Sequence, residues 1–277
     1  MKLAAAARFF DRTVARDAYN PATTFKCQIE PLDLYRMEGT RLKVRGMSTA
    51  PGITIPARRV IVIDGQRYLV SDASPDQWEG AAIRNRYVIQ GADSAVQIRT
   101  IPQVLANDPG VIAYGSVDFN KYNTDERDSS DYHPQYHVFL GSSEAVDEHY
   151  ILSADGRTYL VKNAHLTPSG IKDALANLLD DPVIDSASFV SRAYDPITDS
   201  YTDTSSTVRC IRVRWQEHFN YLSQGSRKFE RADTVVLMPL SVTPKAGDKV
   251  TIGGEPWEIL SIVTLSGYRS AHTRRTS

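Results

Sequence analysis

The sequence predicts a mainly β protein, made of tandem small β-barrel or sandwich modules with an N-terminal helix and few other helices. Short segments in which apolar and polar residues alternate recur along its 277 residues, and Gly, Pro, Asp or Asn bounds most of them, as is typical of small sandwiches and barrels. Three of these segments share one hairpin pattern. With 42% hydrophobic and 23% charged residues, the chain has the composition of a folded protein. No apolar run approaches the ~20 residues of a membrane-spanning helix.

Residues 2–19 are predicted to form an amphipathic helix that Asn20-Pro21 ends, because the residue before proline avoids the helical conformation. Such a helix packs on its own domain or docks on a neighbour. Arg8 and Asp11 interrupt its apolar stretch, which is too short for the core of a signal peptide, so we expect a protein made and used in the cytoplasm. The apolar stripe at helical spacing consists of Leu3, Ala6, Ala7, Phe10 and Val14, of which Phe10 and Val14 are candidate oligomer or partner contacts.

After this segment the chain is predicted to be rich in strands. The expected strands are residues 24–30, 40–45, 59–63, 67–70, 86–90, 135–140, 150–153, 158–162, 208–215, 234–240, 249–252 and 257–263.

Two further helices and two loops are expected between these strands. Ser74-Pro75-Asp76-Gln77 offers an N-cap, a proline at the first helical position and a capping-box Gln. Thr167-Pro168 opens a second helix, which Asp180-Asp181-Pro182 ends. Its apolar stripe is Ile171, Ala174, Leu175, Leu178 and Leu179. The polar segments 123–131 and 194–206 show no periodicity and are interpreted as loops, the second one as a linker.

The recurring hairpin aligns residues 61–70, 152–161 and 250–259 without gaps. Each segment has an apolar strand, an Asp-Gly or Gly-Gly turn, and an aromatic residue three positions after the second turn residue. These dipeptides suit tight hairpins, whose central residues need positive φ. The aromatic residues are Tyr68, Tyr159 and Trp257. Duplication of the first and third modules is the favoured interpretation. A third copy in the middle, or chance similarity among hairpins, stays open.

Charge divides the chain into three parts although the net charge is only −1. Residues 1–105 carry 15 basic and 10 acidic side chains, residues 106–203 carry 6 and 17, and residues 204–277 carry 11 and 6. We therefore expect an N-terminal helix (1–20), a first β-barrel module (21–105), an acidic middle module with a hairpin and a helix (106–203), and a C-terminal β-barrel module (204–277). This charge pattern suits copies that stack head to tail, or a molecule that presents one acidic surface. It is also compatible with three solvated surfaces that differ in composition.

Basic side chains near the end of the chain are candidates for contacts with other molecules. Arg supplies most of the positive charge and suits interfaces better than Lys does. The basic candidates are Arg209, Arg212, Arg214, Arg274 and Arg275. The two cysteines, Cys27 and Cys210, lie in apolar strand-like segments and are expected to be buried free thiols, with a disulfide as the alternative.

No catalytic, metal or cofactor motif stands out. His133 and His137 have ligand spacing, but Pro134 lies between them and zinc sites need three or four ligands. The chain has no glycine-rich phosphate loop between a strand and a helix and no serine at a nucleophile elbow. We expect no enzyme activity, no cofactor and no metal.

Residues 235–263 resemble the head-closure and head–tail joining proteins of tailed bacteriophages. These proteins are small β-barrels in which a Pro-x-x-Gly-Asp-(Arg/Lys)-Val segment leads into a Gly-Glu-x-(Tyr/Trp)-x-(Ile/Val) hairpin. Here the lead-in is residues 244–250, PKAGDKV, and the hairpin is residues 254–259, GEPWEI. A weaker version covers residues 59–70. The acidic middle and the N-terminal segment depart from this pattern.

The resemblance implies a structural protein of the virion neck. Such proteins form rings of six or twelve copies between the portal or an adaptor and the tail or its terminator. Genomic DNA passes through the ring non-specifically, and no membrane is involved. An acidic loop lining the lumen would limit adhesion to phosphates, and its candidates are Asp125, Glu126, Asp128 and Asp131.

Other functions remain open at this stage. The same kind of barrel serves tail terminators and baseplate hubs, and position in the particle would separate them. A soluble β-rich binding module would be a monomer with an exposed aromatic pocket. A hydrolase would need carboxylates that converge in a cleft.

Overall fold

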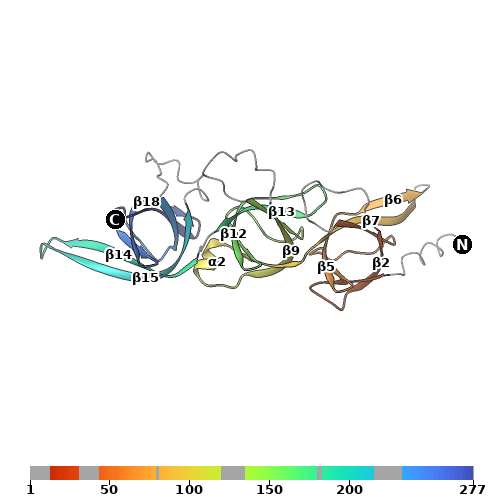
Figure 1. Ribbon diagram of the computed structural model, residues 1–277, viewed down its shortest axis with the longest axis horizontal. Helices are drawn as coiled ribbons and strands as arrows, with labels where there is room; N and C mark the ends of the chain where they lie inside the picture. Colours follow the sequence, from red (N-terminus) through yellow and green to blue (C-terminus); the bar gives the residue numbers. More distant parts are fainter. Residues whose placement is uncertain are drawn as a thin grey trace.

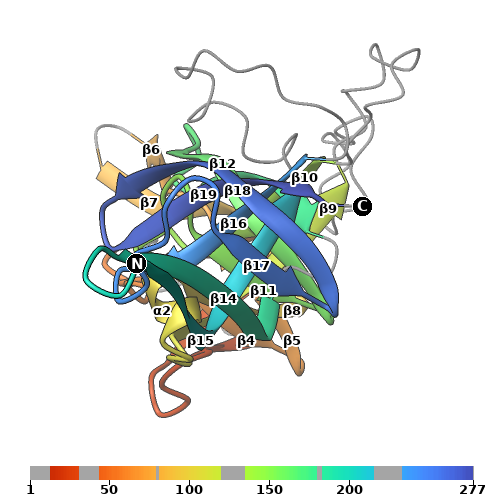
Figure 2. The same cartoon turned by 90° about the vertical axis from the view of Figure 1, so that its left-hand side faces the viewer.

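The computed structural model describes residues 13–30, 44–78, 81–119, 135–179, 183–214 and 233–276. They form three closed six-stranded antiparallel barrels, which follow one another in a row (Figure 1). The expected mainly β class with tandem small barrels is confirmed. Viewed along the row, the barrels lie one behind another (Figure 2). No helix among the described residues is long and apolar enough to cross a membrane.

Barrel 1 contains the strands between residues 13 and 91. Its strands are β1 (Thr13–Asp17), β2 (Thr24–Glu30), β3 (Val44–Thr49), β4 (Val60–Ile63), β5 (Gln66–Val70) and β7 (Ala81–Gly91). The barrel closes where β3 pairs with β7. A seventh strand, β6 (Ser74–Trp78), pairs with β7 and extends it as a ribbon.

Barrels 2 and 3 contain the remaining elements. Barrel 2 is built from β8 (Ser94–Arg99), β9 (Val111–Phe119), β10 (Gln135–Leu140), β11 (Ile151–Ala154), β12 (Arg157–Leu166) and β13 (Lys172–Leu179), with the short helix α2 (Ile101–Leu105) after β8. Barrel 3 is built from β14 (Val183–Asp195), β15 (Ser200–Arg214), β16 (Asp233–Pro239), β17 (Lys249–Ile252), β18 (Glu255–Leu265) and β19 (Tyr268–Arg275). Thus β8, in the basic first third, belongs to barrel 2, and β14, in the acidic part, belongs to barrel 3.

All three barrels share one topology. When the strands of each barrel are counted in chain order, with β7 as the sixth strand of barrel 1, their order around the barrel is first, second, third, sixth, fifth, fourth. The fourth and fifth strands are the recurring hairpin in every case. The middle module is therefore built like the outer two.

The three hairpins also agree in turn and register. Both turn residues have positive φ in each hairpin, 49° and 79° at Asp64-Gly65, 51° and 73° at Asp155-Gly156, and 59° and 82° at Gly253-Gly254. This is the conformation of the type I′ turn, whose twist matches that of the strands. The aromatic residue after each turn pairs with an aliphatic residue and is buried in its barrel: Ile61 with Tyr68, Leu152 with Tyr159, and Val250 with Trp257.

The predicted N-terminal helix is wrong for its second half. Residues 13–17 form β1, which pairs with β2 and β4, and Phe10 lies outside the described residues. Within the segment, Ala15 faces the core of barrel 1 while Val14 is exposed. Pairing on both sides satisfies the backbone of this short segment, and it overrides the local helical pattern.

Two other helices and one loop were also wrongly expected. Residues 74–78 form β6, and residues 172–179 form β13. Both faces of β13 are buried, Ala174 and Ala176 inside barrel 2 and Leu179 against barrel 3, so its apolar residues do not alternate. Residues 194–206 belong to the long hairpin of β14 and β15. The short helix α2 carries a capping box between Thr100 and Gln103.

The two cysteines are free and fully buried, Cys27 in barrel 1 and Cys210 in barrel 3. Burial raises the pKa of Cys27 to about 11 and that of Cys210 to about 12. With these pKa values, about one thiol in a thousand or fewer is ionised at pH 8. Since the thiolate is the reactive form, both cysteines are expected to be unreactive in the native protein.

We therefore expect neither cysteine of the native protein to react with an aromatic disulfide reagent at pH 8, and both to react in urea. Ile197→Cys, at an exposed position, provides the reactive control. Rapid labelling of the native wild-type chain would contradict the buried positions.

Candidate functional site

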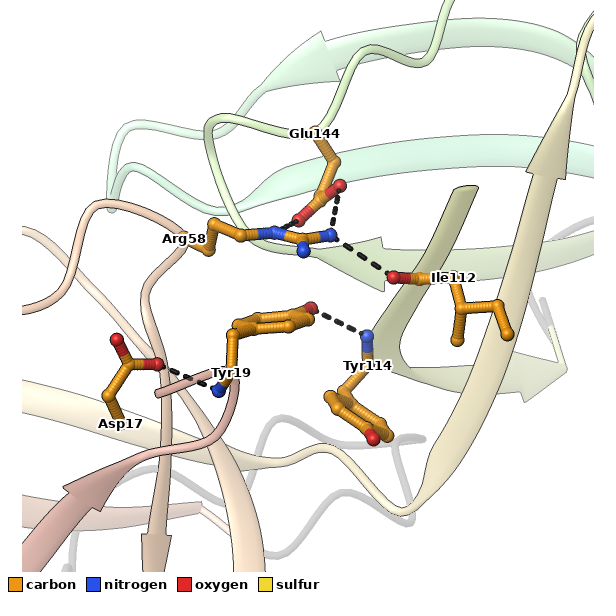
Figure 3. A network of polar contacts seen from close by, with 6 residues as sticks. All are labelled: Asp17, Tyr19, Arg58, Ile112, Tyr114 and Glu144. Atoms are coloured by element: carbon orange, nitrogen blue, oxygen red, sulfur yellow. Dashed lines mark hydrogen bonds and ion pairs between the residues drawn. The ribbon is translucent and has the colours of Figure 1, made fainter. Parts of the chain in front are cut away.

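Arg58 joins barrels 1 and 2 (Figure 3). Its guanidinium donates from Nε to Glu144 Oε1 at 2.7 Å and from Nη2 to Oε2 at 3.0 Å. It also donates to the carbonyl of Ile112 at 3.2 Å and lies 3.6 Å above the centre of the Tyr19 ring. The bond to the buried Glu144 carboxylate raises the pKa of Arg58. A two-pronged pair of this kind fixes orientation as well as distance.

Tyr19, in the connection between β1 and β2, reaches from barrel 1 to barrel 2. Its hydroxyl accepts the backbone N–H of Tyr114 at 2.9 Å, and the two ring centroids are 5.3 Å apart. Asp17 accepts the N–H of Tyr19 and holds the start of this connection. The guanidinium of Arg67, on β5 of barrel 1, lies 4.1 Å from the centre of the Tyr114 ring. Tyr19 and Arg67 of barrel 1 therefore both contact β9, the second strand of barrel 2.

Equivalent aliphatic pairs form the apolar part of both junctions. In barrel 1 the outward-facing pair is Val60 and Leu69, which lies in one cluster with Phe139 of barrel 2. The pair at the same register in barrel 2 is Ile151 and Leu160, which lies in one cluster with Leu237 of barrel 3. Helix α2 adds Ile101, Val104 and Leu105 to this second cluster. Apolar packing therefore continues across both junctions of the row.

Polar residues replace these apolar ones at both free ends of the row. The pair that corresponds to Val60 and Leu69 is Lys249 and Glu258 in barrel 3. The residue of barrel 1 that corresponds to Phe139 and Leu237 is Ser48, whose hydroxyl donates to Glu30 at 2.8 Å. Terminal units of stacked arrays need a polar outer face to stay soluble. At these two positions the described residues therefore do not continue the apolar pattern of the junctions.

A groove of about 310 Å³ lies between barrels 2 and 3. Its lining is more apolar than polar and comes from the start of α2, the segment before β11 and the turn between β18 and β19. The lining residues are Thr100, Ile101, Pro102, Glu148, His149, Tyr150, Leu265, Ser266 and Tyr268. Burial lowers the pKa of His149, so this imidazole is neutral near pH 7.

His137 of β10 forms an ion pair with Asp173 of β13. Its Nδ1 lies 2.9 and 3.1 Å from the two carboxylate oxygens. This hydrogen bond raises the pKa of His137 above its ordinary value of 6.5. A raised folded-state pKa means that the pair stabilises the fold fully below pH 6.5, and that this stabilisation is lost as the pH rises through the folded-state pKa.

The variant His137→Gln is therefore expected to lose stability relative to the wild type mainly below pH 6.5. Urea unfolding of both proteins at pH 5.5, 7 and 8.5 measures the difference, which should shrink toward high pH. The difference between the two proteins also cancels the opposite contribution of His149. A difference that does not depend on pH would contradict the ion pair.

The structure does not bring the sequence-predicted contact residues together. Val14 is exposed on barrel 1, whereas Arg209, Arg212 and Arg214 lie on β15 of barrel 3. Arg209 faces Arg99 at the junction of barrels 2 and 3, where it lowers the pKa of Arg99 in addition to the larger effect of burial. Arg274 and Arg275 end β19, and Arg275 pairs with Glu255 at 2.6 Å. The acidic candidates Asp125, Glu126, Asp128 and Asp131 lie outside the described residues.

Sequence reasoning missed the residues of the junctions. Arg58 and Glu144 are 86 positions apart, and no local pattern links them. Among the described residues, no group of three His, Cys, Asp or Glu side chains is arranged to hold a metal ion. No protein-family model, no curated protein and no solved structure matches the chain.

Proposed function

We propose that this protein is a structural subunit of the neck of a tailed bacteriophage, where copies of it form a ring that joins the portal and head to the tail. The observation that carries the proposal is a row of three barrels of one topology, with a long hairpin beyond the last barrel. A row of this kind suits holding two bodies apart, because apolar clusters join its barrels and hydrophobic contacts between domains oppose their relative motion.

The resemblance to head-closure proteins supports the same role. The residues that carry it, 244–259, form the lead-in and the β17–β18 hairpin of barrel 3. The hairpins of barrels 1 and 2 have the same register, so three units of one kind are available to contact sister copies, the portal and the tail. In this proposal the chain catalyses nothing, and DNA passes through the ring without specific contacts.

Gold-labelled antibodies against the chain test this role on particles of the tailed phage whose genome encodes it. The label is expected at the junction of head and tail, and a nonsense mutation in the gene should leave filled heads without tails. Label at the distal tip of the tail would assign the chain to the baseplate hub instead. Particles that lack the chain altogether would overturn the structural role.

A second candidate, a ligand-binding module, is favoured by the groove between barrels 2 and 3. Its apolar lining and the neutral His149 resemble a site for a small, mostly apolar molecule. Screening the chain by ligand-detected NMR against small aromatic compounds tests this candidate. Binding that Tyr150→Ala and Tyr268→Ala abolish would support it.

A further inference from the structure

The hairpin of β14 and β15 extends beyond barrel 3 as an arm. β14 pairs with β17 only as far as Val190, opposite Lys249, and β15 pairs with β16 only from Ile211 onward. Between these limits, residues 191–195 and 200–204 pair with each other alone among the described strands. Figure 1 shows the arm continuing the row past barrel 3, at the end opposite barrel 1. The arm is therefore the outermost part of this end of the molecule.

The tip of the arm is a defined turn. The carboxylate of Asp195 accepts the backbone N–H of Ile197 at 2.9 Å and the hydroxyl of Thr198 at 2.8 Å, and these bonds lower the pKa of Asp195. Asp199 completes the turn with φ of 48°. The side chain of Ile197 is 92% exposed. An ordered tip that presents an aliphatic side chain to solvent loses little freedom when it binds.

In barrels 1 and 2 alike, the connection between the first and the second strand packs against the next barrel. In barrel 1 the connection from the first to the second strand holds Tyr19, which binds Tyr114 on the second strand of barrel 2. In barrel 2 this connection is α2, which packs on β15 and β16, the second and third strands of barrel 3. In barrel 3 the corresponding connection is the arm. The arm thus corresponds to the two docking connections, and among the described residues no fourth barrel follows it.

Barrel 1 has the complementary property, because no barrel in the described structure precedes it. Its second strand is β2, and the shared register places Lys26 where barrel 2 has Tyr114. Val14 lies opposite Lys26 on β1 and is 52% exposed. Arg16 follows Val14 on the same face of β1 and is exposed. We call the surface formed by Val14, Arg16 and Lys26 the β1–β2 face.

The charges of the arm and of this face are opposite. Residues 191–203 contain three aspartates and one arginine, and Asp199 and Asp203 are exposed. The β1–β2 face contributes two cations, and each surface carries one exposed aliphatic residue. Complementary charge steers an encounter and fixes its register. We propose that the arm of one copy docks on the β1–β2 face of a second copy, with Ile197 near Val14 and the aspartates near Arg16 and Lys26.

This contact is heterologous, since the arm and its acceptor are different surfaces at opposite ends of the row (Figure 1). Heterologous contacts produce a ring when the rotation between copies closes, and an open chain when it does not. This inference rests on the proposed structural role, which it extends by naming the two surfaces that join one copy to the next. Because the contact is polar, soluble copies are expected to associate reversibly.

Analytical ultracentrifugation of the full chain at micromolar concentration tests the contact. The wild type is expected to associate, whereas Asp199→Lys with Asp203→Lys, and separately Arg16→Glu with Lys26→Glu, should be monomeric. An equimolar mixture of these two variants should associate again, because each reversed surface then meets an opposite charge. Asp93→Lys with Asp147→Lys is the control for the arm variant, since it changes the net charge by the same amount at positions outside both surfaces.

A cross-link tests the geometry independently. The chain with both Val14→Cys and Ile197→Cys should give a ladder of disulfide-linked oligomers on oxidation. Each single variant should give no ladder, because the proposed contact brings position 14 of one copy to position 197 of another. A monomeric wild type, or association that neither charge reversal weakens, would overturn the proposal. Association by the arm in a protein that is missing from phage particles would instead overturn only the proposed neck function.

Discussion

Replacing Tyr159 with alanine is expected to lower the free energy of unfolding by about 3–5 kcal/mol. Tyr159 is almost completely buried in barrel 2, where its ring meets that of Tyr136 edge-on with centroids 5.2 Å apart. Its removal leaves a cavity that closed strands cannot collapse around. Urea unfolding followed by circular dichroism measures the loss.

Matched variants separate the aromatic ring from its hydroxyl and test the equivalence of the barrels. Tyr159→Phe keeps the ring and should stay within about 1 kcal/mol of the wild type. Tyr68→Ala and Trp257→Ala remove the equivalent rings of barrels 1 and 3 and should each cause a loss of similar size. A tolerated Tyr159→Ala would contradict its position in the core.

Gly141→Ala is expected to force barrels 1 and 2 apart. A Cβ at this position would overlap the backbone carbonyl of Arg58, in the other barrel. Backbone cannot move aside as the end of a flexible side chain can, so the junction must open or distort at a cost of roughly 1–3 kcal/mol. The bond from Arg58 to Glu144 should weaken with it.

Small-angle X-ray scattering and urea unfolding measure this change. The variant should have a larger radius of gyration, and it should unfold at lower urea concentration. Ser142→Ala, at the next residue, is the control and should leave both measurements unchanged. A variant that scatters and unfolds like the wild type would show that the junction is looser than the contact between Gly141 and Arg58 implies.

The hairpins could be predicted because their signals are local. An Asp-Gly or Gly-Gly pair between apolar strands demands one turn type, and strand alternation then places Tyr68, Tyr159 and Trp257 in the cores. The order of the other strands around each barrel is set by pairing between distant segments. That part of the fold has no short sequence signature.

The wrong helices at β13 and β1 have different physical causes. A strand that lies between two barrels is buried on both faces, so its apolar residues lose the period of two. In β13, Ala174 faces the barrel while Leu179 packs against its neighbour, and this combination resembles a helical stripe. In β1, pairing with two strands overrides the helical pattern around Val14.

The junctions and the arm were beyond sequence reasoning for a different reason. Arg58 and Glu144 are distant in sequence and meet only once two barrels have formed. The segment around Ile197 is polar and rich in turn-forming residues, so it is typical of a linker. Only the long register between β14 and β15 distinguishes it as an ordered hairpin.

The length of the row depends on which side chains lie on the outward face of each recurring hairpin. The same cross-strand pair of the hairpin is Val60 with Leu69 in barrel 1, Ile151 with Leu160 in barrel 2, and Lys249 with Glu258 in barrel 3. The aliphatic pairs pack against the next barrel, whereas the charged pair disfavours the apolar packing of a further barrel on barrel 3. A gene duplication that inserted another unit ahead of barrel 3 would therefore lengthen the protein by one whole step, with no redesign of the units already present.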